Sequence, residues 1–263
     1  MILCFSGTGN SLYAAKIISS ACGDEIISLN DTLKHGGPAL YFSEKPWVVV
    51  SPVHGWRLPA AIDALLRRAK FSGPRRMYFF LTCGSEAGDA AKYCRGLCQD
   101  IGMDYMGLNY AVMPENYLAM FPTPDAEEAG RIIQTARPGI EAAAAEIAAG
   151  RALADPNAGP LDKFKSGPVN RVFRAAFIKD KKFRALDSCI GCGVCQSVCP
   201  MGNFYLEGGK ARRKQTTCEF CLACAQNCPQ KAIGLSIADK NPKARYRNPH
   251  ISLQEIIDAN ANS

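Results

Sequence analysis

The feature that most constrains this chain is a cysteine motif that occurs twice in its last third. Each copy has the spacing C-x2-C-x2-C-x3-C-P, and the copies run from Cys189 to Pro200 and from Cys218 to Pro229. Every cysteine of the second copy follows its counterpart by 29 residues. A repeat with a constant offset indicates an internal duplication of one structural unit. We refer to the copies as the first and second cysteine motifs.

The spacing within each motif predicts iron–sulfur chemistry. Three cysteines at x2 intervals on a tight loop can direct their sulfurs to three corners of one 4Fe–4S cubane. The fourth cysteine, which precedes a proline, begins a short helix and ligates the other cluster of a pair. We therefore expect crossed ligand sets, with one cluster bound by Cys189, Cys192, Cys195 and Cys228. The other cluster would be bound by Cys199, Cys218, Cys221 and Cys224.

A zinc site is the alternative for these cysteines, since two C-x2-C pairs can form a Cys4 site. Zinc leaves the third cysteine of each motif and the proline after each fourth cysteine unexplained.

Gly191 and Gly193 let backbone N–H groups approach the sulfides, which helps to set the potential of the clusters. With no secretory signal, 13 cysteines favour thiolate ligands over disulfides. From about Leu186 to Leu235 the sequence resembles the bacterial two-cluster ferredoxins.

The first 150 residues alternate short apolar runs with segments of helical periodicity. The expected strands are Met1–Phe5, Trp47–Ser51, Met77–Thr82 and Met106–Met113. The expected helices are Asn10–Ala21, Pro59–Lys70, Asp89–Gly102 and Asp125–Gly150. Pro138 should kink or divide the last of these helices. Strands separated by helices predict right-handed βαβ units and a parallel sheet.

A loop rich in glycine and hydroxyl groups joins the first strand to the first helix. It consists of Ser6, Gly7, Thr8, Gly9, Asn10 and Ser11. Its backbone N–H groups, its hydroxyls and the helix N-terminus can together hold a phosphate monoester. Neither the dinucleotide fingerprint nor the Walker loop is present. The loop is similar to the phosphate loop of flavodoxins, and this resemblance implies bound FMN.

Two further loops agree with the flavodoxin resemblance, which places the isoalloxazine ring beyond the carboxyl ends of the strands. The residues implied are Pro52, Val53, His54, Gly55, Trp56, Thr82, Cys83, Gly84, Gly88 and Asp89. Trp56 is the candidate to stack on the ring. Two alternatives remain, in which Trp56 packs at the surface and His54 only bonds within its loop. Cys83, Cys94 and Cys98 are more typical of small buried hydrophobic residues than of redox thiols.

The string Met113–Tyr117 completes a resemblance that spans nearly the whole chain. With the loops above, it is similar to a family of flavodoxin–ferredoxin fusion proteins of anaerobes, which implies that Asn116 and Tyr117 border the flavin. The third loop, which follows the expected strand Met77–Thr82, offers Cys83 and Ser85 but no aromatic residue. One face of the ring is therefore expected to be open.

The fold class that this resemblance implies is α/β. It combines a flavodoxin-like, doubly wound parallel sheet of order 2-1-3-4-5 with a small α+β two-cluster ferredoxin domain. The expected boundaries are 1–155 for the flavodoxin-like domain, 156–185 for a basic linker, 186–240 for the ferredoxin domain and 241–263 for a tail.

Positive charge is concentrated after residue 160, where 17 Lys and Arg stand against 8 Asp and Glu. Part of it would balance the anionic cluster sites, and the rest would steer an acidic redox protein as partner. The linker, with Phe164, Phe173, Phe177 and Phe183 among basic residues, either lies on a membrane or nucleic acid or packs between the domains. Its Gly167-Pro168 pair favours packing, and no nucleic-acid-binding motif is evident.

These features predict an electron-transfer protein that relays electrons between FMN and two 4Fe–4S clusters. The alternative is an FMN-dependent reductase of a small molecule, with the clusters feeding the flavin. The sequence does not decide between a carrier and an enzyme, because no acid–base or nucleophile constellation is recognisable. No apolar run reaches the length of a membrane span and no signal peptide is evident, so a cytoplasmic protein is expected. Oligomeric state is not predicted.

Overall fold

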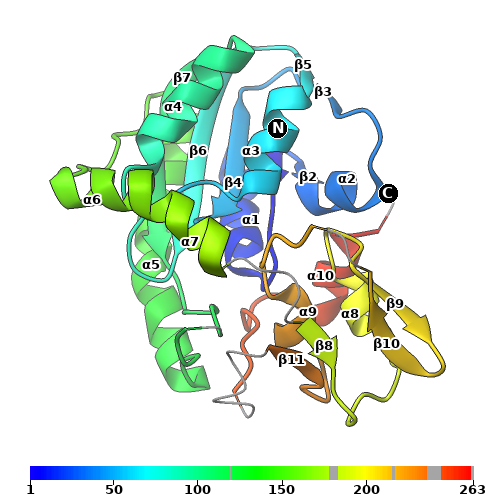
Figure 1. The fold of residues 1–263 in the computed structure, drawn as a ribbon. Coiled ribbons are helices and arrows are strands. Elements are labelled where there is room, and N and C mark those ends of the chain that lie inside the picture. Colours follow the sequence, from blue (N-terminus) through cyan, green and yellow to red (C-terminus); the bar gives the residue numbers. More distant parts are fainter. Residues whose placement is uncertain (119, 178–182, 215–216, 236–243, 262–263) are drawn as a thin grey trace.

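A five-stranded parallel sheet forms the N-terminal part of the chain (Figure 1). The computed structural model describes residues 1–118, 120–177, 183–214, 217–235 and 244–261. The strand order is β2-β1-β4-β6-β7. Counted within the sheet, this is the flavodoxin-like order 2-1-3-4-5, so the predicted fold class is confirmed. The strands are β1 (Ile2–Cys4), β2 (Ile26–Ser28), β4 (Trp47–Pro52), β6 (Arg76–Cys83) and β7 (Asp104–Val112).

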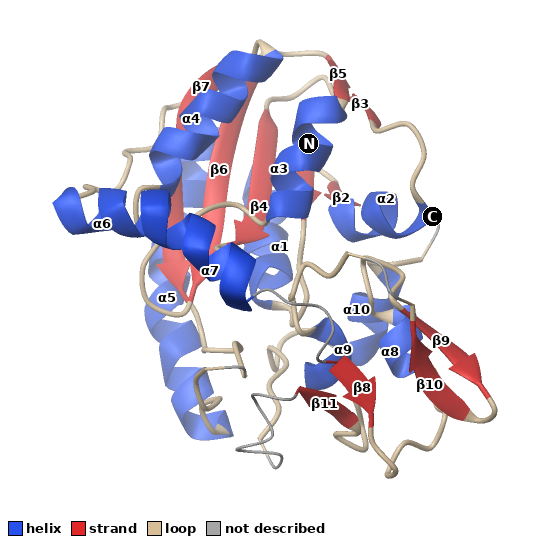
Figure 2. Ribbon diagram, in the orientation of Figure 1, coloured by secondary structure: helices blue, strands red, loops and turns tan. Residues whose placement is uncertain are grey.

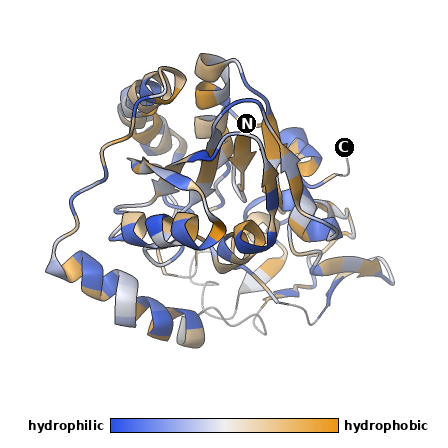
Figure 3. Cartoon of the chain, turned by 90° about the horizontal axis from the view of Figure 1, so that it is seen from above, coloured by the Kyte–Doolittle hydropathy of each residue, from blue (hydrophilic) through white to orange (hydrophobic). Residues whose placement is uncertain are grey.

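Helices cover both faces of this sheet (Figure 2). They are α1 (Asn10–Cys22), α2 (Leu29–His35), α3 (Ala60–Arg68), α4 (Ala90–Ile101) and α5 (Ala126–Ala148). One apolar core lies between the sheet and α3 and α4, and a second lies between the sheet and α1 and α5. Figure 3 shows hydrophobic strands at the centre and helices whose outer faces are hydrophilic. This arrangement leaves the loops at the carboxyl ends of the strands free to form a site.

In the N-terminal part, four short elements escaped the sequence prediction. They are β2, α2, β3 (Leu40–Phe42) and β5 (Lys70–Ser72), and all three strands have only three residues. Runs this short carry too little periodicity to be recognised. Of the two outcomes expected at Pro138, a kink or a division of the last helix, division does not occur, because α5 continues through this residue. Ile133 and Ile140, on either side of the proline, are both buried, so packing holds the helix together there.

The cysteine-rich region contains two short antiparallel ladders, β8 with β11 and β9 with β10. Its elements are β8 (Phe183–Ala185), α8 (Val194–Ser197), β9 (Phe204–Glu207), β10 (Lys210–Arg213), α9 (Ala223–Gln226) and β11 (Ile233–Leu235). A last helix, α10 (Leu253–Asp258), follows in the segment 244–261, which we call the tail. Part of the predicted linker (178–182) and the predicted boundary after residue 240 lie outside the described residues.

The connector between the two parts is a continuous helical run rather than an extended linker. It comprises α6 (Pro160–Phe164), the π-helical turn η1 (Lys165–Val169) and α7 (Asn170–Phe177). Phe173 packs on Trp56 and Tyr117, which both belong to the N-terminal part. Phe164, in contrast, is 57% exposed. The run therefore lies against the loops that follow the strands (Figure 1).

The cysteine-rich region and the tail pack directly on the N-terminal part. Val198 and Ala223, which belong to the two cysteine motifs, share an apolar core with Ile18 of α1. Ile251 and Ile256 of the tail belong to the same core. This shared burial fixes the cysteine motifs next to the loop between β1 and α1.

Candidate functional site

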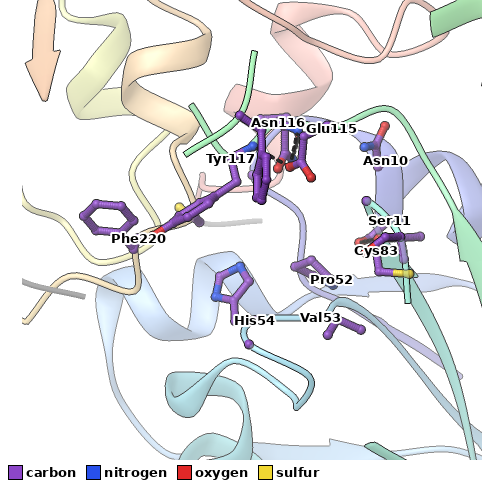
Figure 4. Close-up of a pocket in the computed structure, with 18 of the residues that line it drawn as sticks. Asn10, Ser11, Pro52, Val53, His54, Cys83, Glu115, Asn116, Tyr117 and Phe220 are labelled. Carbon is purple, nitrogen blue, oxygen red and sulfur yellow. Dashed lines mark hydrogen bonds between the residues drawn. The ribbon is translucent and has the colours of Figure 1, made fainter. Parts of the chain in front are cut away.

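A cavity of about 280 Å³ opens at the carboxyl ends of β1, β4 and β6. All of the predicted cofactor-binding residues line it except Gly9, Gly88 and Asp89. Those that line it are Ser6, Gly7, Thr8, Asn10, Ser11, Pro52, Val53, His54, Gly55, Trp56, Thr82, Cys83, Gly84, Asn116 and Tyr117. Figure 4 shows His54 and Tyr117 on one side of the cavity and Asn10, Ser11 and Cys83 on the other.

The loop from Ser6 to Ser11 forms the polar end of this cavity. The Gly9 N–H donates to Ser6 Oγ (3.2 Å), and Ser11 Oγ lies 2.8 Å from Thr82 Oγ1. Thr8 is 1% exposed, and its Oγ1 accepts a hydrogen bond from Asn116 Nδ2 (2.6 Å). Each hydroxyl can still donate or accept once more. Helix α1 begins at Asn10, and the first N–H groups of a helix have no partner within it. This donor set fits a phosphate group.

The three predicted residues that do not line the cavity have structural contacts instead. Gly9 (φ 96°) faces the tail, where an added Cβ would lie 3.0 Å from Asn248 Cβ and Ile251 Cβ. Gly88 leaves room for Trp56, whose Cβ would lie 2.8 Å from an added methyl group. The buried Asp89 donates its N–H to Ser166 Oγ (2.8 Å) of the helical connector. These positions support the cavity from outside it.

Trp56, the predicted stacking residue, lines the cavity but has several protein contacts. Its indole N–H donates to Glu86 Oε1 (2.9 Å), and its ring packs edge-on against Phe173. Its backbone is in the left-handed region (φ 65°), which is unusual for a non-glycine residue. Backbone strain at a cavity is typical of a functional position. Stacking on a flavin stays a prediction for Trp56.

Several lining residues were not predicted from the sequence to bind the flavin. They are Ser85, Glu86, Pro114, Glu115, Met120, Phe121, Phe173, Phe220 and Cys221. Phe173 comes from the helical connector, whereas Phe220 and Cys221 come from the second cysteine motif. The Glu115 carboxylate is held by the N–H groups of Asn116 (2.9 Å) and Tyr117 (2.7 Å), and it fills the space beside Gly84. The cavity is thus built by both parts of the chain.

The eight motif cysteines lie in two groups. A small second cavity is lined by Cys189, Cys192, Cys195 and Cys228, which we call cluster site I. The other four cysteines, Cys199, Cys218, Cys221 and Cys224, are called cluster site II. Cys199 lies close enough to Cys221 and Cys224 that a thiolate at Cys199 would raise the pKa of both thiols. This grouping places the fourth cysteine of each motif with the first three of the other, which supports the crossed assignment.

Backbone N–H groups point at the motif sulfurs. The Ala211 N–H donates to Cys189 Sγ (3.4 Å) and lowers the pKa of that thiol. The N–H groups of Asn203 and Ala232 donate to Cys199 Sγ (3.3 Å) and Cys228 Sγ (3.2 Å). Such N–H···S bonds help to set the potential of an iron–sulfur cluster.

Desolvation alone would keep two cysteines of site II protonated. It raises the pKa of the Cys221 and Cys224 thiols well above the ordinary value, so thiolates there depend on a positive metal charge. Among the described residues, no three His, Cys, Asp or Glu side chains converge as they would on one metal ion. In a cubane each cysteine bonds a different iron, so the four sulfurs stand further apart than the ligands of a single ion.

Three cysteines outside the motifs lie in surroundings that favour the protonated thiol. Burial raises the pKa of Cys83 and Cys98 to about 12 and that of Cys94 well above its ordinary value. Thiols that stay protonated are weak nucleophiles and weak ligands. Cys94 and Cys98 belong to the apolar core beneath α4, as the sequence interpretation favoured.

The two motifs differ where the first has glycine. Gly191 and Gly193 have φ angles of 68° and 78°, and their counterparts Phe220 and Leu222 keep the left-handed conformation at 58° and 60°. Non-glycine residues are strained there. Phe220 and Leu222 are buried, and Phe220 lines the larger cavity. In the second motif, backbone strain thus accompanies large side chains that pack in the core of the cysteine-rich region, and Phe220 also reaches the cavity.

The loop from Ser6 to Ser11, which we call the phosphate-type loop, packs tightly against Cys221 of cluster site II. A Cβ added to Gly7 would lie 2.6 Å from the Cys221 carbonyl oxygen and 3.3 Å from Cys221 Cβ. Cys221 also lines the larger cavity. A group bound in that cavity would thus be adjacent to Cys221, a predicted ligand of cluster site II.

Glu219 provides a second connection between the parts. It is 5% exposed, and its carboxylate accepts from the N–H groups of Ala60 (2.8 Å) and Ala61 (2.9 Å) at the start of α3. His54 Nδ1 lies 3.5 Å from the same carboxylate. An acidic side chain at a helix N-terminus is stabilising. Glu219 therefore caps α3 from the second cysteine motif.

Replacing Glu219 by alanine is expected to loosen the start of α3. Removal of a cap costs about 0.5–2 kcal/mol, which corresponds to roughly two- to thirtyfold faster exchange of the Ala60 and Ala61 amides. Hydrogen exchange followed by mass spectrometry or NMR checks this. An exposed control, Glu127→Ala on α5, should leave the same amides unchanged. Unaltered exchange in the Glu219 variant would show that the capping bonds contribute nothing.

The fold and the site together define an α/β protein with a cysteine-rich iron–sulfur region. Residues 181–245 match the family model of a 4Fe–4S dicluster domain. Through this region the chain belongs to the two-cluster 4Fe–4S ferredoxin family. The ferredoxin of Methanothermococcus thermolithotrophicus is 40% identical over 50 residues, which cover 18% of this chain and 83% of the ferredoxin. The ferredoxin of Thermococcus litoralis is 43% identical over 49 residues, with coverages of 18% and 83%.

Two further comparisons concern larger or structural relatives. A component of an ion-translocating oxidoreductase complex from Methanosarcina acetivorans is 42% identical over 57 residues, so the match spans only 22% of its length and 22% of this chain. Among solved structures, the flavodoxin of Megasphaera elsdenii covers 55% of this chain and 98% of its own, at 17% identity and a TM-score of 0.31. The strand order itself carries the flavodoxin-like assignment.

The predicted combination of a flavodoxin-like sheet with a two-cluster ferredoxin domain is thus confirmed. Iron–sulfur clusters of this family give the chain an electron-transfer role. In the part of the chain that the structure describes, no helix combines the length and apolarity needed to cross a membrane.

Proposed function

We propose that the chain binds FMN in the larger cavity and relays electrons between this flavin and its two 4Fe–4S clusters. The observation that carries the proposal is the position of Cys221. It lines the cavity and lies so close to Gly7 of the phosphate-type loop that a Cβ added there would be 2.6 Å from the Cys221 carbonyl oxygen. The hydroxyls and N–H groups of that loop would hold the phosphate. Bound FMN accepts electrons in pairs and releases them singly, whereas each cluster carries one.

Cofactor content tests this proposal. Anaerobically purified protein should contain about eight iron, eight sulfide and one FMN per chain, taking four iron per cluster. Addition of FMN to flavin-free protein should restore the flavin spectrum. Full clusters without any uptake of FMN would reject the flavin site and leave a ferredoxin joined to an α/β domain of other use.

The exposure of the cysteines gives the relay an order. Cys192 of cluster site I is exposed, whereas Cys199 and Cys224 of site II are buried. Site II lies beside the cavity, so site I is the terminus for exchange with another protein. Ile190 (62% exposed) and Leu206 (42% exposed) border site I and offer an apolar contact.

The charge around site I favours a redox protein with an acidic face as the partner. Arg184 on β8 and Arg212 on β10 are exposed beside the strands that enclose the site. Complementary charge mainly accelerates association and does so most at low ionic strength. This assignment agrees with the concentration of positive charge after residue 160.

Reversal of both charges, Arg184→Glu with Arg212→Glu, is expected to slow reduction of an acidic two-cluster ferredoxin by about tenfold at low ionic strength. The difference should fade as salt is added, because exposed charges are screened. Stopped-flow kinetics measure it. The matched control is Arg131→Glu with Arg137→Glu on α5, which makes the same charge change elsewhere. An equal loss in both variants would reject a docking face at site I.

A reductase of a small molecule is the second candidate. It is favoured by the third loop, where Cys83, Gly84 and Ser85 line the cavity without an aromatic ring. Glu115, beside Gly84, would offer a polar contact to a substrate at that face, and His54 would offer one from the opposite side of the cavity. A screen of small-molecule acceptors against reduced protein discriminates the two, since a carrier should be reoxidised by redox proteins and not by metabolites.

A further inference from the structure

A closed ring of hydrogen bonds joins the phosphate-type loop, cluster site II and the tail. It passes through Gln226, the last residue of α9, which is 4% exposed. Gln226 Nε2 donates to the Asn116 carbonyl oxygen (2.6 Å), and Gln226 Oε1 accepts from the Tyr246 N–H (2.7 Å). One side chain of the second cysteine motif thereby connects a cavity-lining loop to the tail.

From Asn116 the ring returns to the phosphate-type loop. Asn116 Nδ2 donates to Thr8 Oγ1 (2.6 Å), and both residues line the cavity. Because Gln226 fixes the Asn116 carbonyl group, it also fixes the amide that orients the Thr8 hydroxyl.

The tail closes the ring from the other side. The Tyr246 hydroxyl donates to Asn10 Oδ1 (2.6 Å), and Asn248 Nδ2 lies 3.3 Å from the same oxygen. The Asn248 N–H donates to the Thr8 carbonyl oxygen (2.9 Å). Tyr246, Asn248 and Asn10 are all buried. A buried polar network is costly to break, since each lost partner leaves an unsatisfied group.

The duplication shows that this network belongs to the second motif alone. The position equivalent to Gln226 in the first motif is Ser197, whose hydroxyl lies 3.4 Å from the Gly193 carbonyl oxygen of its own turn. Asn227, which replaces Val198, directs Nδ2 toward the Gly7 carbonyl oxygen (3.4 Å). Neither Gln226 nor Asn227 is required by the cysteine spacing. Both face the N-terminal part of the chain.

We propose that Gln226 is a positioning residue that couples the FMN site to cluster site II. This inference rests on the proposed function. In the sequence, Gln226 lies between two predicted ligands of the clusters, and through Asn116 it orients the loop that would receive the phosphate. A change at the clusters should therefore alter that loop, and a change in the loop should alter the clusters. Coupling of this kind is reciprocal: if the ring favours FMN, bound FMN must in turn favour the arrangement of cluster site II.

The test compares Gln226→Ala with the wild-type chain, both with full clusters. FMN affinity is measured by fluorescence quenching, and the EPR spectrum of the reduced clusters is recorded with and without FMN. We expect FMN to bind the variant at least about tenfold more weakly, with iron and sulfide unchanged. The spectral change that FMN causes in the wild-type clusters should be lost. A purely structural role for Gln226 would not remove that signature selectively.

Two further variants make the outcome decisive. Ser197→Ala, the equivalent change in the first motif, should leave FMN affinity unaltered. Tyr246→Phe removes one hydroxyl of the ring outside both motifs and should weaken FMN binding by about threefold or more, even if Gln226→Ala fails to retain its clusters. Wild-type FMN affinity in the Tyr246 variant, or equal effects of the Gln226 and Ser197 changes, would overturn the coupling. Failure of the wild-type chain itself to bind FMN would instead reject the proposed function.

Discussion

A chain carrying Cys199→Ala together with Cys218→Ala should retain one intact 4Fe–4S cluster and about four iron. Under the crossed assignment both residues serve cluster site II, so site I keeps all of its ligands. The small cavity lined by Cys189, Cys192, Cys195 and Cys228 supports this assignment. Iron and sulfide analysis with EPR of the reduced protein gives the measurement.

The opposite pair distinguishes crossed from sequential ligation. Cys199→Ala with Cys192→Ala removes one ligand from each site under the crossed assignment, so no intact 4Fe–4S cluster should remain. If each cluster were instead bound by the four cysteines of one motif, the Cys199/Cys192 variant would keep one intact cluster. The Cys199/Cys218 variant would then keep none. An intact cluster in the Cys199/Cys192 variant would therefore contradict the crossed assignment.

The second large effect is expected at Gly7. The methyl group of Gly7→Ala would lie 2.6 Å from the Cys221 carbonyl oxygen, and the cluster loop cannot retreat without moving a cluster ligand. Overpacking of this kind costs about 1–3 kcal/mol. If the cost lies near the upper end of that range and falls on FMN binding, FMN affinity should fall by about a hundredfold. Flavin titration of the cluster-loaded protein measures the change.

Gly130→Ala on α5 provides the control, because an added methyl group meets no atom within 4 Å there. It should bind FMN like the wild-type chain. Normal FMN affinity in Gly7→Ala with both clusters present would show that contact between the loop and Cys221 does not shape the cavity.

Much of the architecture could be predicted because it follows from local pattern. The cysteine spacing indicates two clusters without reference to other parts of the chain. The phosphate-type loop lies between a strand and a helix that both have clear periodicity. The strand order followed from the resemblance, even though β2 is too short to be recognised. These features are carried by neighbouring residues, so a sequence displays them directly.

What could not be predicted depends on contacts between distant segments. Tyr246 bonds Asn10 across 236 positions, and Gln226 bonds Asn116 across 110. Such pairs leave no periodic pattern in the sequence from which they could be predicted. One signal was present but unused: the second motif has Phe220 and Leu222 where the first has glycine. Large residues at positions that favour glycine suggest that their side chains are needed for packing. Here both pack in the core of the cysteine-rich region, and Phe220 also lines the cavity.

The internal transfer of electrons tests the relay most directly. In protein loaded with FMN and both clusters, flash reduction of the flavin should be followed by its reoxidation as the clusters bleach at the same rate. That rate should not depend on protein concentration, since donor and acceptor lie in one chain. Reoxidation that accelerates in proportion to protein concentration, with no first-order phase, would contradict a relay between the cavity and the cluster beside Cys221.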